Sequence, residues 1–444
     1  MKKVLFLIIV MMSCSLVSQQ LIGKVQHFSS TSELSIVEIS ERVIKEIKLD
    51  NEGTFSTENL KLSEGYYLFR SGNESITIYL KQNDVLVINF DAGELVNTVA
   101  FSGEGSKRNT YLISKRRYSD KFKEKTDVFY GVDVVQYKNN VMSLQKRYKE
   151  LLTKEKLGKD FVYNEITNLK YDYLLDLFNY KNSQKVYFGK EIKMPSEFLA
   201  LFEKTYLDNE KLYTIFPAYK NLASLKWKLD IENNEGFVKM DQVFSKVKIK
   251  PLSLELLFSF YYAITEKPEK VQDYYALFRK YVTSPNFIRR AKNQLNSVKA
   301  TAKGKKSPSF NYKNTEGKQV ALANFIGKYV FIDVWATWCM PCLQQIPYIE
   351  DLENKFKEKK IVFVSISVDD EDKIDFWKET VKTKAMKGVQ LFADKSFDSD
   401  FIRSYGVASL PRFILIDPSG NIVNSNMYKP SDTKTAKILA DLLQ

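Results

Sequence analysis

The chain has 444 residues, which at roughly 150 residues per domain suggests about three domains. Apolar residues make up 44% and charged residues 27%, a globular composition that excludes a wholly disordered chain. The net charge is +13, and three cysteines and one histidine are too few for a disulfide-stapled scaffold or a complete zinc site.

The N-terminus is typical of a bacterial export signal. Two lysines precede the apolar stretch 4–12, and small residues follow it. The stretch is too short to span a bilayer, and no apolar segment of about 20 residues follows it. Two interpretations of the signal peptide 1–15 remain open: Cys14 becomes the lipid-attached first residue of a lipoprotein, or ordinary cleavage removes it. Both predict a protein of the periplasm or cell envelope, soluble or lipid-anchored.

Residues 20–104 are predicted to form a small N-terminal β-sandwich. Short apolar or β-branched runs recur there, separated by turns that contain glycine. The clearest runs occupy residues 34–39, 66–69, 76–80 and 85–90. No catalytic cluster is visible in this region.

Residues 106–300 are predicted to form a central α-helical region. Apolar residues recur there at three and four positions, and prolines separate the later helices. The basic excess of the chain lies in this region, but its lysines are scattered singly and no nucleic-acid recognition motif accompanies them. We therefore expect no nucleic-acid binding and a solvated helix face; a surface for a membrane or an acidic partner is the alternative.

Residues 305–444 are predicted to form an α/β domain, joined by the basic linker 301–307. Strands are expected at 330–334, 361–368, 389–392, 413–416 and 422–424. Helices are expected at 342–359, 370–384, 397–404 and 431–443, the last capped by Ser431 or Asp432.

The segment FIDVWATWCMPC, residues 331–342, places a Cys-x-x-Cys pair where a strand ends and a helix begins. A thiolate of Cys339 at the helix N-terminus is stabilised by unpaired N–H groups and the helix dipole. Cys342, one turn later, is placed to resolve a mixed disulfide. Pro341 lies in the first turn, where its missing N–H costs little.

Other interpretations of the pair are weaker. A zinc half-site lacks its remaining ligands, and covalent haem attachment requires histidine where Leu343 stands. A peroxiredoxin requires threonine and proline at the positions of Ala336 and Ile332. A purely structural disulfide remains an alternative, against which Trp338 and Pro341 beside the cysteines argue.

Residues 305–444 resemble a thioredoxin-fold domain of the TlpA/ResA type. GKYVFIDVWATWCMPC is similar to the active-site signature of that family, Pro347 matches the proline that follows it, and YGVASLPRFILIDPSGNIV resembles the later proline, strand and turn. The segments LIGKV, EGTFSTENLKLSEGYY and FSGEGSKRNTYL resemble the extra domain before thioredoxin modules of large exported bacterial proteins.

The resemblance implies roles for matching residues. Cys339 is the nucleophile and Cys342 the resolving thiol. Asp333, where thioredoxins carry a buried acid, assists deprotonation of Cys342; a hydrogen-bonded core aspartate is the alternative. Pro411 is a cis-proline facing the disulfide, beside which the backbone of Leu410 pairs with substrate.

Three residues around the cysteines are implied to shape the site. Trp338 lies beside the sulfur pair, with a plain core tryptophan as the alternative, whereas Trp335 is expected in the core. Met340 and Pro341 tune the redox poise. The family usually has glutamate where this chain has Gln345, which puts any acid–base role of that residue in doubt.

The expected function is thiol–disulfide exchange by an exported reductase of protein disulfides. It needs an upstream membrane electron donor and, beyond the Cys339–Cys342 disulfide, no cofactor or metal. The alternative is a partner-binding or redox-sensing envelope protein in which the thioredoxin fold has little turnover.

Overall fold

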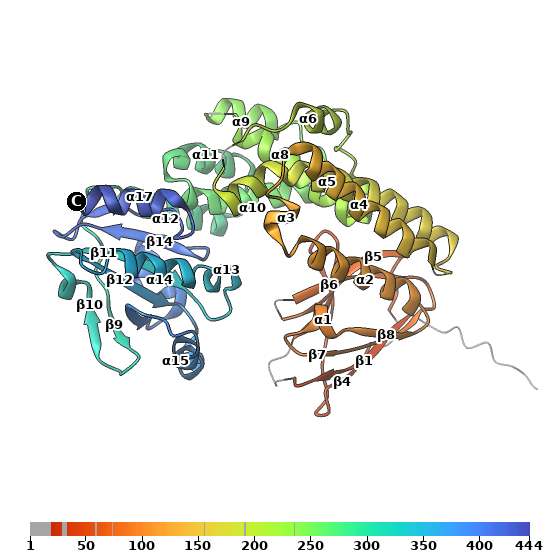
Figure 1. Ribbon diagram of the computed structural model, residues 1–444, viewed down its shortest axis with the longest axis horizontal. Coiled ribbons are helices and arrows are strands. Elements are labelled where there is room, and N and C mark those ends of the chain that lie inside the picture. Colours follow the sequence, from red (N-terminus) through yellow and green to blue (C-terminus); the bar gives the residue numbers. More distant parts are fainter. Residues whose placement is uncertain are drawn as a thin grey trace, which may run out of the picture. The chain divides into compact units, whose positions relative to one another are not determined.

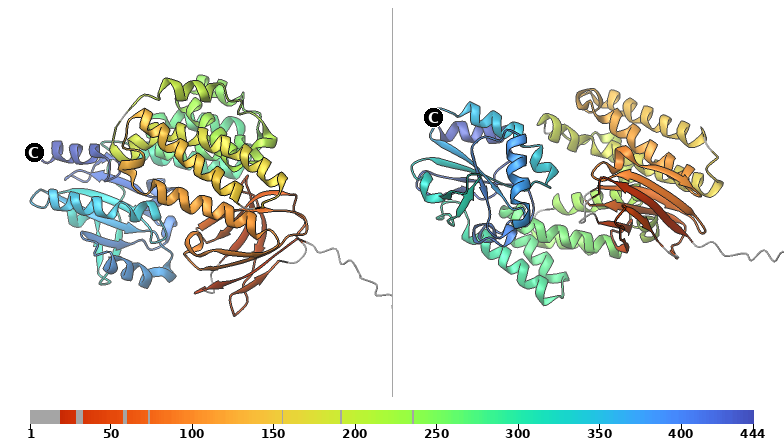
Figure 2. Two further views of the ribbon diagram at one scale, coloured as in Figure 1. Left: turned by 45° about the vertical axis from the view of Figure 1, so that its right-hand side comes forward. Right: turned by 90° about the horizontal axis from the view of Figure 1, so that it is seen from below.

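The structure is a computed structural model that describes residues 19–28, 33–57, 60–72, 74–154, 156–190, 192–234 and 236–444. The expected signal segment 1–15, with Cys14, lies outside these residues. The chain forms two compact units that divide between Lys226 and Trp227 (Figures 1 and 2). Within the described ranges, no helix is both long and apolar enough to cross a membrane.

The first unit contains the expected β-sandwich. Its two four-stranded sheets have the orders β4-β1-β7-β8 and β3-β2-β5-β6. Both sheets contribute to one core, which includes Leu21 and Ile88 from the first and Ile36, Phe69 and Ile78 from the second. The strands are β1 Gln20–Gln26, β2 Leu34–Glu38, β3 Val43–Ile47, β4 Thr54–Ser56, β5 Gly65–Ser71, β6 Glu74–Leu80, β7 Val85–Asp91 and β8 Ala100–Gly103, with the short helix α1 Leu95–Thr98 before β8.

Helices follow the sandwich in the first unit, and α2 packs against β6 and β8 (Figure 1). They are α2 Ser106–Lys123, α3 Thr126–Phe129, α4 Val134–Lys154, α5 Lys159–Phe188, α6 Ser196–Glu203, α7 Glu210–Ile215 and the first part of α8 Pro217–Glu232, within which the two units divide. Two of the basic residues are not on a solvated face. Lys115 lies 2.6 Å from the fully buried Glu165, and Lys123 lies 2.6 Å from Asp176. Part of the basic excess therefore neutralises acids inside this unit.

The second unit begins within α8, continues with four further α-helices and then forms an α/β domain whose seven-stranded sheet has the order β10-β9-β13-β12-β11-β14-β15. The helices are α9 Phe237–Phe244, α10 Lys250–Glu266, α11 Val271–Tyr281 and α12 Pro285–Ala300. The strands are β9 Asn311–Asn314, β10 Gln319–Ala321, β11 Tyr329–Trp335, β12 Ile361–Ser367, β13 Val389–Phe392, β14 Arg412–Ile416 and β15 Ile422–Asn424. The predicted helical region is thus divided between the two units.

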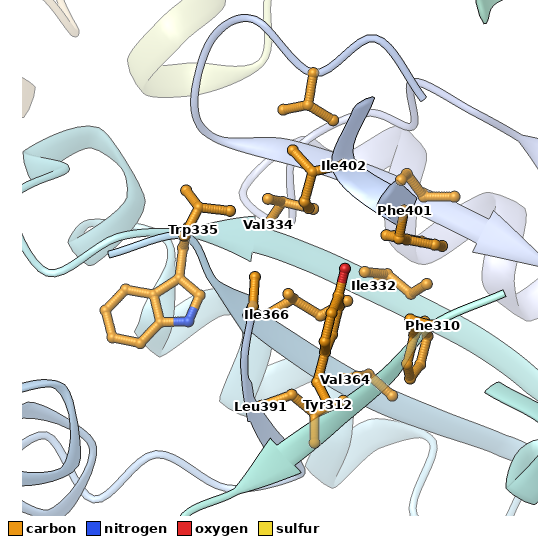
Figure 3. Close-up of a cluster of buried hydrophobic side chains, with 14 of the residues drawn as sticks. Phe310, Tyr312, Ile332, Val334, Trp335, Val364, Ile366, Leu391, Phe401 and Ile402 are labelled. Carbon is orange, nitrogen blue, oxygen red and sulfur yellow. The ribbon is translucent and has the colours of Figure 1, made fainter. Parts of the chain in front are cut away.

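The sheet is covered on both faces, as an α/β domain requires. Helices α14 Ile346–Lys355 and α17 Thr433–Leu442 pack in one cluster with Phe331, Phe363 and Phe413. Helices α15 Ile374–Thr383 and α16 Asp400–Ser404 pack in the other, which Figure 3 shows around Ile332 and Val364. The thioredoxin-like fold expected from the sequence is confirmed.

Two local expectations for this domain differ from the structure. The expected helix 342–359 is two helices, α13 Met340–Leu343 and α14, because Pro347 has no N–H with which to continue the first. The expected linker 301–307 is anchored to the domain: Gly304 N donates to Ile422 O at 2.7 Å, and Ser307 N donates to Gly420 O at 3.0 Å. These are main-chain bonds, which a basic side-chain pattern does not reveal.

Asn109 covers the open edge of the sandwich at β6. It is fully buried; its Oδ1 accepts from Tyr79 N at 2.8 Å, and its Nδ2 donates to Tyr79 O at 3.0 Å and Gly105 O at 2.9 Å. The side chain thus takes the place of a neighbouring strand and satisfies the edge backbone.

We expect Asn109→Ala to destabilise the first unit by about 2–3 kcal/mol, because both polar groups of Tyr79 lose a buried partner. Hydrogen–deuterium exchange should show faster exchange at β6. Asn139→Ala, at an exposed position of α4, is the control and should leave exchange unchanged. Equal protection of β6 in the two variants contradicts this role of Asn109.

Candidate active site

The cysteine pair lies just beyond the carboxyl end of β11 and is joined as a disulfide, with the two Cα atoms 5.2 Å apart. Cys339 is the N-cap residue of α13, and its Sγ accepts a hydrogen bond from Cys342 N at 3.2 Å. The exposed fractions are 4% for Cys339 and 2% for Cys342. The N-terminal residue of the pair therefore already has an N–H group directed at its sulfur, the contact that stabilises a thiolate.

The residues next to Cys339 form an exposed rim. Trp338 is 51% exposed and Met340 is 64% exposed, and Pro341 in the first turn of α13 is exposed as well. A core position for Trp338 is therefore wrong, whereas Trp335, 1% exposed, lies in the core as expected. A substrate that reaches Cys339 meets this apolar rim first.

The sheet register brings the proline loop to the same place. The Leu410–Pro411 peptide bond is cis. Strand β14 runs antiparallel to β11 with Arg412 opposite Val334, so the residues before β14 lie at the end of β11 from which the cysteine loop emerges. Leu410 packs against the core cluster that contains both cysteines. The contact of Leu410 with substrate remains a prediction.

Asp333 lies in the middle of β11, paired in register with Ser365 of β12 and Phe413 of β14. It is 3% exposed, and its Oδ1 has no hydrogen-bond partner in the described part of the chain. Burial raises the pKa of Asp333 to about 8. The missing partner of Oδ1 distinguishes Asp333 from the hydrogen-bonded core aspartate of the alternative interpretation. With its pKa raised close to neutral pH, the carboxyl can both accept and release a proton there.

Asp369 is a site residue that the sequence analysis missed. It is fully buried, and its carboxylate accepts from Thr337 N at 3.0 Å, Thr337 Oγ1 at 2.6 Å and Ser367 Oγ at 2.6 Å. These bonds hold the loop between β11 and Cys339. Thr337 and Asp369 each follow one of the two parallel strands β11 and β12, which end at the same edge of the sheet. In the sequence, their positions just after two predicted strands were the signal that could have shown them to be neighbours.

Arg412 and Gln345 complete the surroundings. Arg412, which follows Pro411, is 3% exposed, and burial lowers its pKa to about 10 while the charge of Glu266 acts in the opposite direction. Gln345 is 7% exposed, and its Oε1 accepts from Ser431 N at 3.1 Å. Gln345 thus fixes the loop before α17 at the position where the resembled family has glutamate.

The described residues contain no cluster of possible metal ligands. Nowhere among them do three or more histidine, cysteine, aspartate or glutamate side chains gather as a metal site. The groups at this site suited to chemistry are the sulfur pair and the buried acid Asp333.

The pKa of Asp333 predicts how stability depends on pH. A carboxyl with an ordinary pKa near 4 when unfolded and about 8 when folded disfavours folding increasingly as the pH rises from about 4 to about 8. Oxidised Asp333→Asn should equal the wild type at pH 4 and exceed it by up to about 4 kcal/mol in unfolding free energy at pH 7. Urea unfolding followed by tryptophan fluorescence measures this difference.

The matched control is Asp375→Asn, whose carboxylate on α15 is 96% exposed. The difference of up to about 4 kcal/mol at pH 7 should be confined to Asp333→Asn, because only that variant removes a buried carboxyl. A stability difference for Asp333→Asn that stays constant between pH 4 and pH 8 contradicts the burial of an unpaired acid.

The C-terminal part of the chain is similar to known proteins. Residues 302–443 match the family described as Redoxin. The thiol-disulfide oxidoreductase ResA of Bacillus thuringiensis subsp. konkukian is 37% identical over 120 residues, which are 27% of this chain and 66% of that protein. The thioredoxin domain of a thiol-disulfide oxidoreductase from Bacteroides vulgatus is 27% identical, with 32% of this chain and 99% of that chain covered and a TM-score of 0.30.

The relative that decides the family is ResA of Bacillus subtilis. It is 31% identical over 149 residues, which are 30% of this chain and 79% of that protein. Through its C-terminal domain, the chain belongs to the ResA family of thiol-disulfide oxidoreductases.

Proposed function

We propose that the protein is an exported thiol–disulfide oxidoreductase that reduces disulfides of proteins. The observation that carries this proposal is the cysteine pair beside the cis-proline loop, with the unpaired acid Asp333 in the strand that leads to it. Each of these parts has a role in thiol–disulfide exchange, whereas a purely structural disulfide needs neither the acid nor the cis-proline loop. The exposed rim of Trp338 and Met340 gives substrates access.

The reaction starts from the dithiol. The thiolate of Cys339 attacks one sulfur of the substrate disulfide, a mixed disulfide forms, and the other substrate sulfur leaves as a thiolate that takes up a proton. Cys342 then loses its proton and attacks the sulfur of Cys339, which releases the second substrate thiolate. Two electrons pass to the substrate, and the domain ends as the Cys339–Cys342 disulfide. The dithiol itself carries the electrons, so the cycle needs no bound cofactor.

Asp333 accepts the proton of Cys342 in the proposed cycle. A thiol has an ordinary pKa near 8.5, and a carboxyl with a pKa of about 8 exchanges a proton with it at little cost in free energy. The proton then leaves through water when the domain is reduced again. An ordinary, exposed aspartate is a much weaker base and would hold this proton less well.

The reducing direction and the location are part of the proposal. In this proposal an upstream membrane electron donor reduces the oxidised domain again, and the export signal expected in residues 1–15 supports a location in the periplasm or cell envelope. Attachment through a lipidated Cys14 would keep it close to that donor. Cys339 and Cys342 would then work in a compartment in which disulfides form.

Trapping of the intermediate tests the exchange reaction. Cys342→Ser should accumulate a mixed disulfide between Cys339 and a protein substrate, because the resolving thiol is missing. Cys339→Ser should lose turnover. Non-reducing gel electrophoresis with mass spectrometry measures both. Absence of any mixed disulfide in Cys342→Ser favours the alternative of a binding or redox-sensing protein.

The reduction potential of the pair tests the direction. We expect a value near about −250 mV or lower, close to thioredoxin, from equilibration in dithiol buffers followed by tryptophan fluorescence. A value near about −120 mV marks an oxidant instead, and contradicts the reductase assignment while leaving the exchange chemistry intact.

A further inference from the structure

Helix α10 exposes an apolar face. Its buried side includes Leu252, Leu256 and Phe260, yet Leu254, Phe258 and Tyr262 on the other side are 60%, 50% and 41% exposed. Residues four positions apart lie on one face of a helix, so these three form a single stripe. A helix that is apolar on both faces is normally covered on both, so this face is suited to contact with another molecule.

The stripe runs to the proposed active site. Glu266, four residues after Tyr262, is the exposed last residue of α10. Its carboxylate accepts from Ser409 Oγ at 2.7 Å, and its main-chain oxygen accepts from Asn426 Nδ2. Ser409 lies two residues before Pro411 in the cis-proline loop. The apolar face of α10 is therefore continuous with the loop at which substrate is expected to bind.

Helix α12 widens the stripe and helps to fix it. Phe287 is 39% exposed, and its ring centroid lies 6.0 Å from that of Phe258 in an edge-on contact. Further along α12, Ser297 Oγ donates to Arg403 O of α16 at 3.3 Å. The surface is thus held to the C-terminal domain at two places, Glu266 and Ser297.

We propose that the surface formed by Leu254, Phe258, Tyr262 and Phe287 binds an extended apolar segment of the polypeptide substrate next to its disulfide. At 1.5 Å per residue, the stripe extends roughly 18 Å from Glu266 to Leu254, the length of about five or six extended residues. Apolar segments of this length are exposed in incompletely folded proteins, which are the substrate class that this surface selects.

This inference rests on the proposed function and deepens it. Continuity with the cis-proline loop decides the occupant: a peptide bound beside Leu410 has only to continue past Ser409 and Glu266 to reach Tyr262. A small disulfide cannot reach the stripe. The stripe should therefore affect how well a substrate binds, and should leave the exchange step unchanged.

The test uses the full-length protein and two synthetic peptides with the same disulfide loop. One peptide carries a flanking segment of five leucine and phenylalanine residues, and the other carries serine and glycine. Reduced protein is mixed with excess peptide, and the oxidation rate is followed by tryptophan fluorescence. The variant Phe258→Gln/Tyr262→Gln replaces exposed residues with a good helix former. Val238→Gln, at a 64% exposed position of α9, is the control.

We expect the double variant to raise the half-saturating concentration of the apolar peptide about tenfold and to leave its limiting rate unchanged, because aromatic burial is lost. Oxidation by the polar peptide, and both peptides with Val238→Gln, should be unaffected. Equal half-saturating concentrations of the two peptides for the wild type overturn the inference. So does a wild-type dimer in sedimentation that the double variant dissociates, since a second copy then covers the stripe. If neither peptide oxidises the wild type, the proposed function itself fails.

Discussion

The pairing of β11 with its two neighbours is the constraint on which the site depends. Strand β12 lies parallel on one side and β14 antiparallel on the other. The end of β11, the end of β12 and the start of β14 therefore meet at one edge of the sheet. This arrangement brings together Cys339, Asp369 and Pro411, which are far apart in the chain. A register shift of one residue would turn Asp333 to the other face of the sheet and remove the buried acid from the site.

The same sheet keeps two buried titratable groups apart. Asp333 and Arg412 are one register position apart on adjacent strands, so their side chains alternate to opposite faces. The charge of Glu266, at the end of α10, acts on Arg412, whereas Asp333 Oδ1 has no hydrogen-bond partner among the residues that the structure describes. If both side chains lay on one face, an ion pair would lower the pKa of Asp333 and abolish its value as a base near neutral pH.

The sequence predicted the parts of this site that lie in continuous motifs. The buried strands of the C-terminal sheet are apolar runs, and the cysteine motif with Pro411 matches a known family. Asp369 was missed because it begins a run of acids that looks like a solvated helix start, and only its position at the end of β12 shows its role. Lys115 and Lys123 were placed on a solvated face because their acidic partners lie about 50 residues away on α5.

The sequence also did not reveal where the compact unit that holds the active site begins. The Redoxin match begins at residue 302, yet the compact unit that holds the active site begins at Trp227. The contacts explain this difference. Glu266 holds Ser409, and Ser297 bonds to α16, so the helices before residue 302 support the loop that contains Pro411. The family match therefore accounts for the chemistry of the cysteines, whereas the geometry of the loop beside them depends on residues outside the match. In the proposed function, redox chemistry belongs to the thioredoxin-like domain, and the choice of substrate belongs to the helices joined to it.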